Sequence, residues 1–396
     1  MKMVEISEDP KMIYLLEKRD LKKRTAESYL THIRRYCEFN EMTPTELIEE
    51  ARTEQVKFEW MDQRKLPIRL MKFHKHIEPN FTYKTRKLSM GIVRTFYNEF
   101  EIVLPKIKVK ESPDEKRESK EQKIPTIEHI RDAVENSNPK YGAMILLLAT
   151  SGMSKNEMKH LTLKDYYQSL GMEEYDPSII RELNEHVPSN TIPTFDKIIR
   201  RKTGVEYTTF CTPEAMKYIN KYLKREYRNK EPPEDPETKL FIPFQMEKNN
   251  SGMISDQSIA IYFRKLNTKL EWGKSGRFIF FHPHTLRRFF ATTLTTKRVS
   301  ELYSHWLLGH KIDPVTEAYF KSDPESLKRE YRRLIPYLSI KDTSVEVIED
   351  DQVREMKNEM AEIRRENKEL RDAVTEMERK RAEDKVSDYE HTPPPG

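Results

Sequence analysis

Apolar residues of this chain recur mostly at the spacing of amphipathic helices. Between Thr25 and Phe39 the apolar residues Tyr29, Ile33, Tyr36 and Cys37 have a helical spacing, which predicts a helix. Thr43, followed by Pro44, predicts the capped start of the next helix. Further helices are predicted over residues 85–100, where Leu88, Ile92, Phe96 and Phe100 form one stripe, and over residues 127–136, 141–151, 213–228 and 255–270.

One stretch has the alternation of a strand. Lys197–Thr209 alternates and holds Thr203-Gly204, which predicts a β-hairpin with its turn there. Tyr166–Ile192 has no clear period and is interpreted as an insertion with loops. With 10 glycines and 35% charged residues the composition favours helices. The expected fold is therefore mainly α with a small antiparallel β-sheet.

Length and composition exclude several classes. A chain of 396 residues is expected to form two or three domains. It has no apolar run near the ~20 residues of a membrane span, and Met1–Glu5 lacks the apolar core of a signal peptide. Cys37 and Cys211 fall in different predicted domains, so free thiols and a cytoplasmic location are expected. No phosphate-binding glycine-rich loop is present, and no cofactor is expected.

The net charge of +5 is unevenly distributed. Residues 1–123 hold 27 Lys and Arg against 22 Asp and Glu, and residues 342–396 hold 10 against 17. A basic body with an acidic tail suits a polyanionic partner such as double-stranded DNA. Basic side chains on the first helices are the predicted DNA contacts, although a solvated helix face would look the same: Lys22, Lys23, Arg24, Arg34, Arg35, Lys84, Arg86 and Lys87, with Arg288 further along.

Changes in pattern divide the chain. Residues 1–105 are predicted to form a helical N-terminal DNA-binding domain, and residues 106–123, rich in Lys and Glu, a charged linker. Residues 124–341 are predicted to form a second domain, whose catalytic role is argued from the residues below. Residues 345–383 form a predicted coiled-coil helix, and residues 384–396 a disordered tail.

The coiled coil rests on a heptad register. Its a and d positions are Val353, Met356, Met360, Ile363, Asn367, Leu370, Val374 and Met377. An Asn at an a position favours a parallel two-stranded partner. Glu359 would meet Arg364, and Glu366 would meet Arg371, across such a homodimer. The alternative is one amphipathic helix packed on the body.

A set of polar residues near the end of the basic body points to phosphodiester chemistry. His284 and Arg287 stand three residues apart, and Leu308-Gly309-His310 precedes Tyr319 by nine residues from the histidine. Breaking a phosphodiester with a side-chain hydroxyl needs a nucleophile, cations on the phosphate oxygens and a proton for the leaving oxygen. Tyrosine, arginine and histidine or lysine can supply these in turn.

These sequence segments and their order resemble those of the tyrosine recombinase (phage integrase) superfamily, of the archaeal and archaeal-virus integrase type. Residues 282–292 look like its second box, residues 146–161 like its first, and residues 200–204 like the turn that carries its mobile lysine. The resemblance implies a helical core-binding (SAM-like) domain and a catalytic domain that close around DNA as a C-shaped clamp. It also implies tetramers on synapsed DNA.

The resemblance further implies residue roles. Tyr319 would form a 3′-phosphotyrosine, Arg287 would clamp the phosphate, and His284 and His310 would assist. Lys202 would protonate the leaving 5′-oxygen. The reaction would be site-specific integration or excision of a mobile element, with type IB topoisomerase-like strand breakage and rejoining. His282, His284 and His310 lack a carboxylate or cysteine at ligand spacing, so no metal is expected.

One position departs from the pattern. The first box normally has an arginine where this chain has Ser154. Lys155, Arg200 or Arg201 could take its place, although a lysine gives a point charge and not a fork. Two alternatives therefore stay open: a catalytically weakened, recombinase-derived sequence-specific DNA-binding protein, and a coiled-coil architectural DNA-binding protein.

Overall fold

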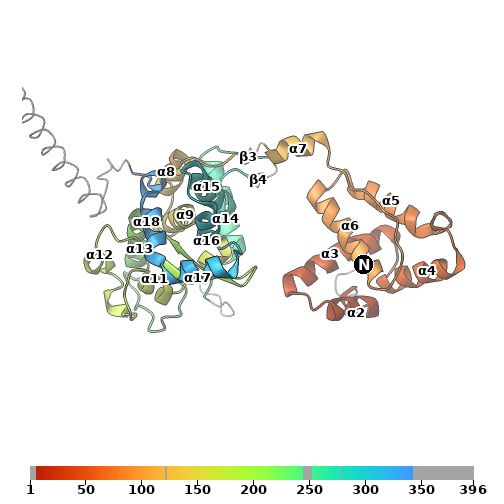
Figure 1. Ribbon diagram of the computed structural model, residues 1–396, viewed down its shortest axis with the longest axis horizontal. Helices are drawn as coiled ribbons and strands as arrows, with labels where there is room; N and C mark the ends of the chain where they lie inside the picture. The colour runs from red at the N-terminus through yellow and green to blue at the C-terminus, as the bar shows by residue number, and fades with distance from the viewer. Residues whose placement is uncertain (1–5, 121–122, 244–251, 277, 342–396) are drawn as a thin grey trace, which may run out of the picture. The chain divides into compact units, whose positions relative to one another are not determined.

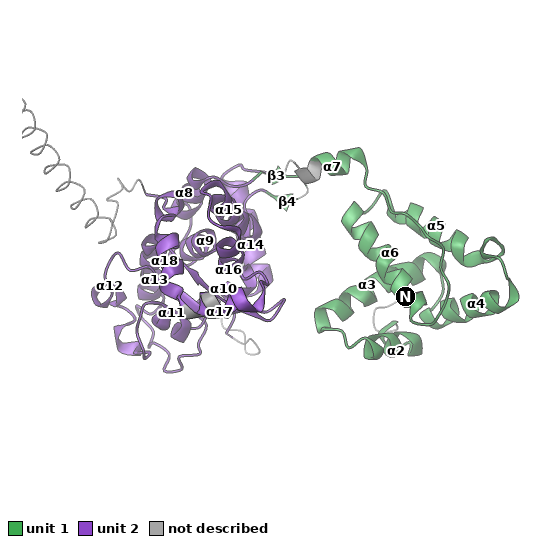
Figure 2. Ribbon diagram, in the orientation of Figure 1, with its two compact units in different colours: residues 1–123, 274–279 green, residues 124–273, 280–396 purple. Residues whose placement is uncertain are grey.

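The computed structural model describes residues 6–120, 123–243, 252–276 and 278–341. They are mainly helical and hold two short antiparallel strand pairs, as expected. The chain divides into unit 1, residues 1–123 and 274–279, and unit 2, residues 124–273 and 280–396 (Figure 2). None of the described helices has the length and apolarity of a membrane span. The predicted coiled coil and tail lie outside the described residues.

Unit 1 is a set of helices around an aromatic core. Their bounds are α2 (Pro10–Lys18), α3 (Lys23–Asn40), α4 (Pro44–Lys57), the 3-10 helix η1 (Met61–Gln63), α5 (Lys65–Ile77), α6 (Tyr83–Asn98) and α7 (Pro113–Lys120). Thr43 caps α4 as predicted, because its side chain accepts from the Glu46 N–H while the Glu46 carboxylate accepts from the Thr43 N–H. In the core, the Tyr36 and Tyr97 hydroxyls lie 3.1 Å apart.

Two expectations for unit 1 need correction. Leu88, predicted on the buried stripe of α6, is 50% exposed, because the stripe turns away from the core at that end of the helix. Arg86, predicted to contact DNA, is buried. Its guanidinium binds both carboxylate oxygens of Glu115, at 3.0 and 2.9 Å. The segment predicted as a linker thus includes α7, and this ion pair fastens α7 to α6.

Unit 2 is built around α9. Its elements are α8 (Ile127–Glu135), α9 (Pro139–Ser151), α10 (Lys155–His160), α11 (Leu163–Ser169), η2 (Pro177–Ile179), α12 (Leu183–His186), β1 (Thr194–Arg200), β2 (Val205–Phe210), α13 (Pro213–Glu226), α14 (Asp256–Lys269), α15 (Pro283–Thr296), α16 (Glu301–Leu307), α17 (Pro314–Ser322), α18 (Pro324–Arg332) and α19 (Ile335–Leu338). The short strands β3 (Lys274–Ser275) and β4 (Phe278–Ile279), which pair with each other, belong to unit 1. Every residue of α9 after its proline is buried. Helices α8, α13 and α15 pack around it (Figure 1).

The predicted hairpin is present and begins three residues earlier than expected. β1 and β2 pair antiparallel, with Arg200 opposite Val205 at the turn end. The register shifts between Phe195 and Ile198, where Lys197 has a φ of +53°. Such a bulge turns the following side chains to the other face of the strand. The segment 166–192 is less irregular than predicted, since it includes most of α11, η2 and α12.

Candidate active site

Arg287 joins the three sequence segments singled out above. It lies on α15 and is 9% exposed. Its guanidinium donates from Nη1 to the Gly152 carbonyl and from Nη2 to the Leu308 carbonyl, each at 2.5 Å. Nη1 also lies 3.8 Å from Oε2 of Glu157. Burial lowers the pKa of Arg287, and Tyr207 and Glu157 oppose this shift.

Arg200 reaches the same place from the hairpin. It is the last residue of β1 and is half-buried. Its Nη1 donates to the carbonyls of Leu308, at 3.0 Å, and Gly309, at 2.9 Å. The guanidinium groups of Arg200 and Arg287 therefore share one carbonyl oxygen, that of Leu308.

Two glycines shape these turns. Gly152 and Gly309 have φ values of +65° and +60°, in the left-handed region that favours glycine. A Cβ on Gly309 would lie 2.7 Å from the Tyr207 ring, and one on Gly152 would overlap the Phe290 ring. Both glycines offer their own carbonyls to the arginines, so the tight turns place the acceptors of the site.

A buried carboxylate supports the arginines. Oε2 of Glu157 accepts from the Ser154 N–H at 2.5 Å and from the Tyr207 hydroxyl at 3.0 Å. Ser154 caps α10, since its hydroxyl accepts from the Glu157 N–H at 3.4 Å. Burial, followed by the charge of Glu157, raises the pKa of Tyr207 well above its usual value, so its hydroxyl stays protonated. Sequence reasoning missed both Glu157 and Tyr207 as site residues, although the Ser-x-x-Glu capping signature marks the glutamate.

The two predicted histidines have different surroundings. His310 is half-buried, and burial, then Arg200 and Arg287, lower its pKa to about 4. Its imidazole is therefore neutral at neutral pH. His284 lies at the surface of α15, where partial desolvation and the charges of Arg288 and Arg287 lower its pKa.

The other predicted cations lie elsewhere on unit 2. Lys155 pairs with Asp256 at 3.2 Å, and Lys159 pairs with the same oxygen at 2.7 Å. Arg201 and Lys202 are exposed in the turn between β1 and β2. Of the three candidates to replace the first-box arginine, Arg200 alone shares an acceptor with Arg287 in the described structure.

Tyr319 belongs to α17, and its side chain lies outside the described part of the chain. The neighbouring residues anchor the helix. The Phe320 ring packs against Tyr303 and Trp306 of α16, with ring centroids 4.9 and 5.7 Å apart. Lys321 pairs with Glu206 of β2 at 3.6 Å. The helix that carries Tyr319 is thus held against α16 and β2 within unit 2.

Among the described residues, no group of three or more His, Cys, Asp or Glu could hold a metal ion. The rings of His282 and His284 lie 6.4 Å apart.

Apart from the buried Arg86, the predicted DNA contacts of unit 1 fall into two groups. Arg34 pairs with Glu38 at 3.8 Å, and the Arg35 guanidinium lies 4.0 Å from the centre of the Phe81 ring. The remaining basic side chains are exposed: Lys22, Lys23, Arg24, Lys84 and Lys87. A groove of about 460 Å³ runs beside the last two, lined by Tyr29, Lys84, Lys87, Leu88, Gly91, Ile92 and Thr95.

No protein-family model matches this chain, and no curated protein matches its sequence. Solved structures of recombinases are similar to it. The XerA recombinase is 15% identical over 84% of this chain and 98% of its own, with a TM-score of 0.34. A lambda integrase(75-356) dimer bound to a COC' core site is 15% identical over 77% of this chain and 91% of its own, with a TM-score of 0.49. The XerH site-specific recombinase bound to palindromic difH substrate is 14% identical over 82% and 83%, with a TM-score of 0.46. At such identities residue roles must be argued from contacts within this chain.

Proposed function

We propose that this protein is a site-specific DNA recombinase that breaks and rejoins DNA through a 3′-phosphotyrosine. The observation that carries the proposal is the convergence of Arg287 and Arg200 on the Leu308–His310 turn. Two guanidinium groups at one point favour an anion with several oxygens, such as a phosphodiester. Tyr319 lies nine residues beyond that turn, on a helix packed in the same unit.

In the proposed reaction the Tyr319 hydroxyl releases its proton to solvent, and its oxygen attacks the phosphorus atom of a DNA phosphodiester. A phosphotyrosine bond forms, the bond to the 5′-oxygen breaks, and that oxygen takes up a proton. Attack by a 5′-hydroxyl on the phosphotyrosine reverses these events and releases Tyr319, so the number of phosphodiesters is conserved. The exchange needs no external energy source and no cofactor.

Each remaining residue has one proposed role. Arg287 binds the phosphate oxygens and stabilises the charge that grows on them. His310, neutral at neutral pH, donates a hydrogen bond to one of them, and His284 offers a second imidazole at the surface. Lys202, in the exposed turn, gives the proton to the leaving 5′-oxygen.

Double-stranded DNA is the proposed partner, because the body of the chain is basic. The exposed lysines and Arg24 of unit 1, together with Arg288 of unit 2, would bind its phosphates. We further propose integration or excision of a mobile element as the biological task, in the manner of archaeal integrases. Self-association through residues 345–383, with tetramers on synapsed DNA, completes this proposal.

A covalent trap tests the chemistry. The protein is mixed with fragmented, nicked DNA from its source genome, quenched with denaturant, and examined for protein attached to 3′ ends. We expect an adduct with the wild type and none with Tyr319→Phe, whose missing hydroxyl removes the nucleophile. Tight DNA binding without an adduct would instead support the second candidate, a catalytically silent DNA-binding protein, which the serine at position 154 favours.

A further inference from the structure

We propose that Arg200 is the second phosphate-binding arginine of this site, supplied by the β1–β2 hairpin and not by the start of α10. The inference rests on the proposed function and assigns one residue where the sequence left three candidates. It makes the hairpin part of the phosphate site itself.

Geometry is the first argument. Nη2 of Arg287 lies 2.5 Å and Nη1 of Arg200 lies 3.0 Å from the Leu308 oxygen. These two nitrogens are therefore at most 5.5 Å apart, which is the sum of the two lengths. Two guanidinium groups at that separation can each bind a different oxygen of one phosphate group.

Unused donors are the second argument. Both hydrogen bonds of Arg200 come from Nη1. Within the described residues its Nε and Nη2 have no hydrogen-bond acceptor, although one edge of a guanidinium group can donate two parallel hydrogen bonds. The carbonyls of Leu308 and Gly309 therefore orient the side chain and leave the Nε–Nη2 edge for a ligand.

Charge is the third argument. Glu157 is the nearest carboxylate to Arg287, at 3.8 Å, and it also accepts from Ser154 and Tyr207. Arg200 forms no ion pair with any residue that the structure describes. Among the described residues, one carboxylate thus lies near Arg287 and none pairs with Arg200, so the remaining positive charge favours an anion at this point.

The competing residues have other partners or positions. Ser154 is occupied as the cap of α10, and Lys155 shares Asp256 with Lys159. Arg201 is exposed in the hairpin turn, where its charge helps to lower the pKa of His160. Neither basic residue shares an acceptor with Arg287.

Inorganic phosphate is the probe. Thermal unfolding of the full chain is followed while phosphate replaces chloride at constant ionic strength, and the change in Tm is compared within each variant. We expect phosphate to raise the Tm of the wild type. Arg200→Ala should weaken the apparent phosphate affinity at least about tenfold, since hydrogen bonds to charged groups are lost. Arg200→Lys should recover part of it, because a point charge replaces the fork.

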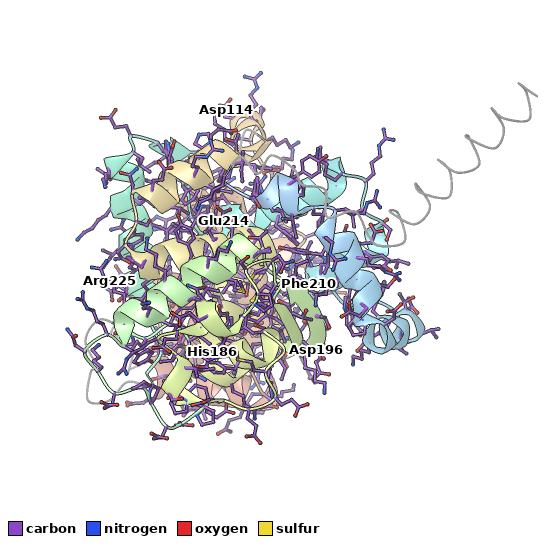
Figure 3. The ribbon with its side chains drawn as sticks, turned by 90° about the vertical axis from the view of Figure 1, so that its left-hand side faces the viewer. Asp114, His186, Asp196, Phe210, Glu214 and Arg225 are labelled. Atoms are coloured by element: carbon purple, nitrogen blue, oxygen red, sulfur yellow. The ribbon has the colours of Figure 1, made fainter. Side chains whose placement is uncertain are left out.

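Two variants serve as controls. Arg225→Ala removes an exposed arginine from the last turn of α13, the helix that Figure 3 shows running from Glu214 to Arg225. Arg201→Ala removes the neighbouring cation of the hairpin. Both should respond to phosphate as the wild type does. The proposal is overturned if Arg200→Ala keeps the wild-type response, if Arg201→Ala loses it, or if the wild type shows no response to phosphate.

The covalent trap separates this proposal from the proposed function. A phosphate response that depends on Arg200, in a wild type that forms no adduct, would keep the phosphate site and reject the recombinase. An adduct formed at the wild-type rate by Arg200→Ala, with an unchanged phosphate response, would keep the recombinase and reject the role of Arg200.

Discussion

Two buried arginines, one in each unit, have opposite electrostatic surroundings. In unit 1, Arg86 donates two hydrogen bonds to the carboxylate of Glu115, so the two charges form a direct ion pair. In unit 2, Arg287 donates to two carbonyls, and the carboxylate of Glu157 lies 3.8 Å away without accepting a hydrogen bond from it. A matched pair fastens a segment in place, whereas an incompletely neutralised arginine leaves a site for an anion.

The largest expected effect separates the two arginines by function. Arg287→Ala should lower the rate of covalent adduct formation by about 10²- to 10³-fold, because a charge aimed at the transition state is lost. Arg86→Ala should leave the rate per folded molecule unchanged and lower the stability of unit 1. Single-turnover adduct formation, corrected for the folded fraction from circular dichroism, measures both. Equal losses of rate in the two variants would contradict the claim that Arg287 acts in the reaction whereas Arg86 acts only in stability.

The turn that carries the shared carbonyl offers the next test. Gly309→Ala should destabilise unit 2 by about 2–4 kcal/mol, since its Cβ would lie 2.7 Å from the Tyr207 ring and its φ is positive. Gly204 is the matched control. It has a φ of +74° but open space around a Cβ, so Gly204→Ala should cost about 1 kcal/mol. Urea unfolding measures both, and equal losses would show that the Tyr207 contact is unimportant.

Much of this architecture could be predicted, because it depends on local patterns. The capping box at Thr43 and the hairpin turn at Gly204 follow from nearby residues alone. The sequence alone could not decide between Arg200 and Arg201, because the bulge in β1 breaks the two-residue alternation of inward and outward side chains. Phe195 and Ile198, for example, are both buried although they stand three positions apart.

Long-range partners set the remaining limits. Arg86 is internal because Glu115, 29 positions away, reaches it. Tyr207 is a site residue because Glu157, 50 positions away, accepts from its hydroxyl. Local sequence patterns do not reveal partners so far apart in the chain. A basic residue on a helix face therefore looks the same in the sequence whether it is paired in the fold or exposed.

A smaller effect is expected for the Arg86–Glu115 ion pair of unit 1, which can be tested through the pH dependence of stability. Hydrogen bonds from Arg86 lower the pKa of Glu115 to about 2. A lowered carboxyl pKa stabilises the fold above the unfolded value of about 4.5, and this contribution disappears as the pH falls toward 2. Glu115→Gln should therefore cost about 2 kcal/mol at pH 7 and little near pH 2.5. Urea unfolding at the two pH values checks this, and a cost independent of pH would contradict it.

The smallest effect is expected for the arginine site of unit 2 and is measured through the pKa of His310. Its pKa of about 4 lies below the unfolded value of about 6.5, so the folded state favours the neutral ring. The resulting stabilisation is complete above about pH 6.5 and is lost as the pH falls toward 4.

Arg200→Ala should raise the pKa of His310, because it removes the second-largest cause of the shift. The pKa should remain below 6.5, since burial, the largest cause, persists. An NMR titration of the imidazole C–H signals, with His310→Gln to assign the resonance, measures this change, and Arg225→Ala should leave the pKa unmoved. A wild-type His310 that titrates near 6.5 would mean that neither arginine faces the turn in solution. The claim that both arginines bind the Leu308 carbonyl would then be rejected. The contrast drawn between the arginine sites of the two units would be rejected with it.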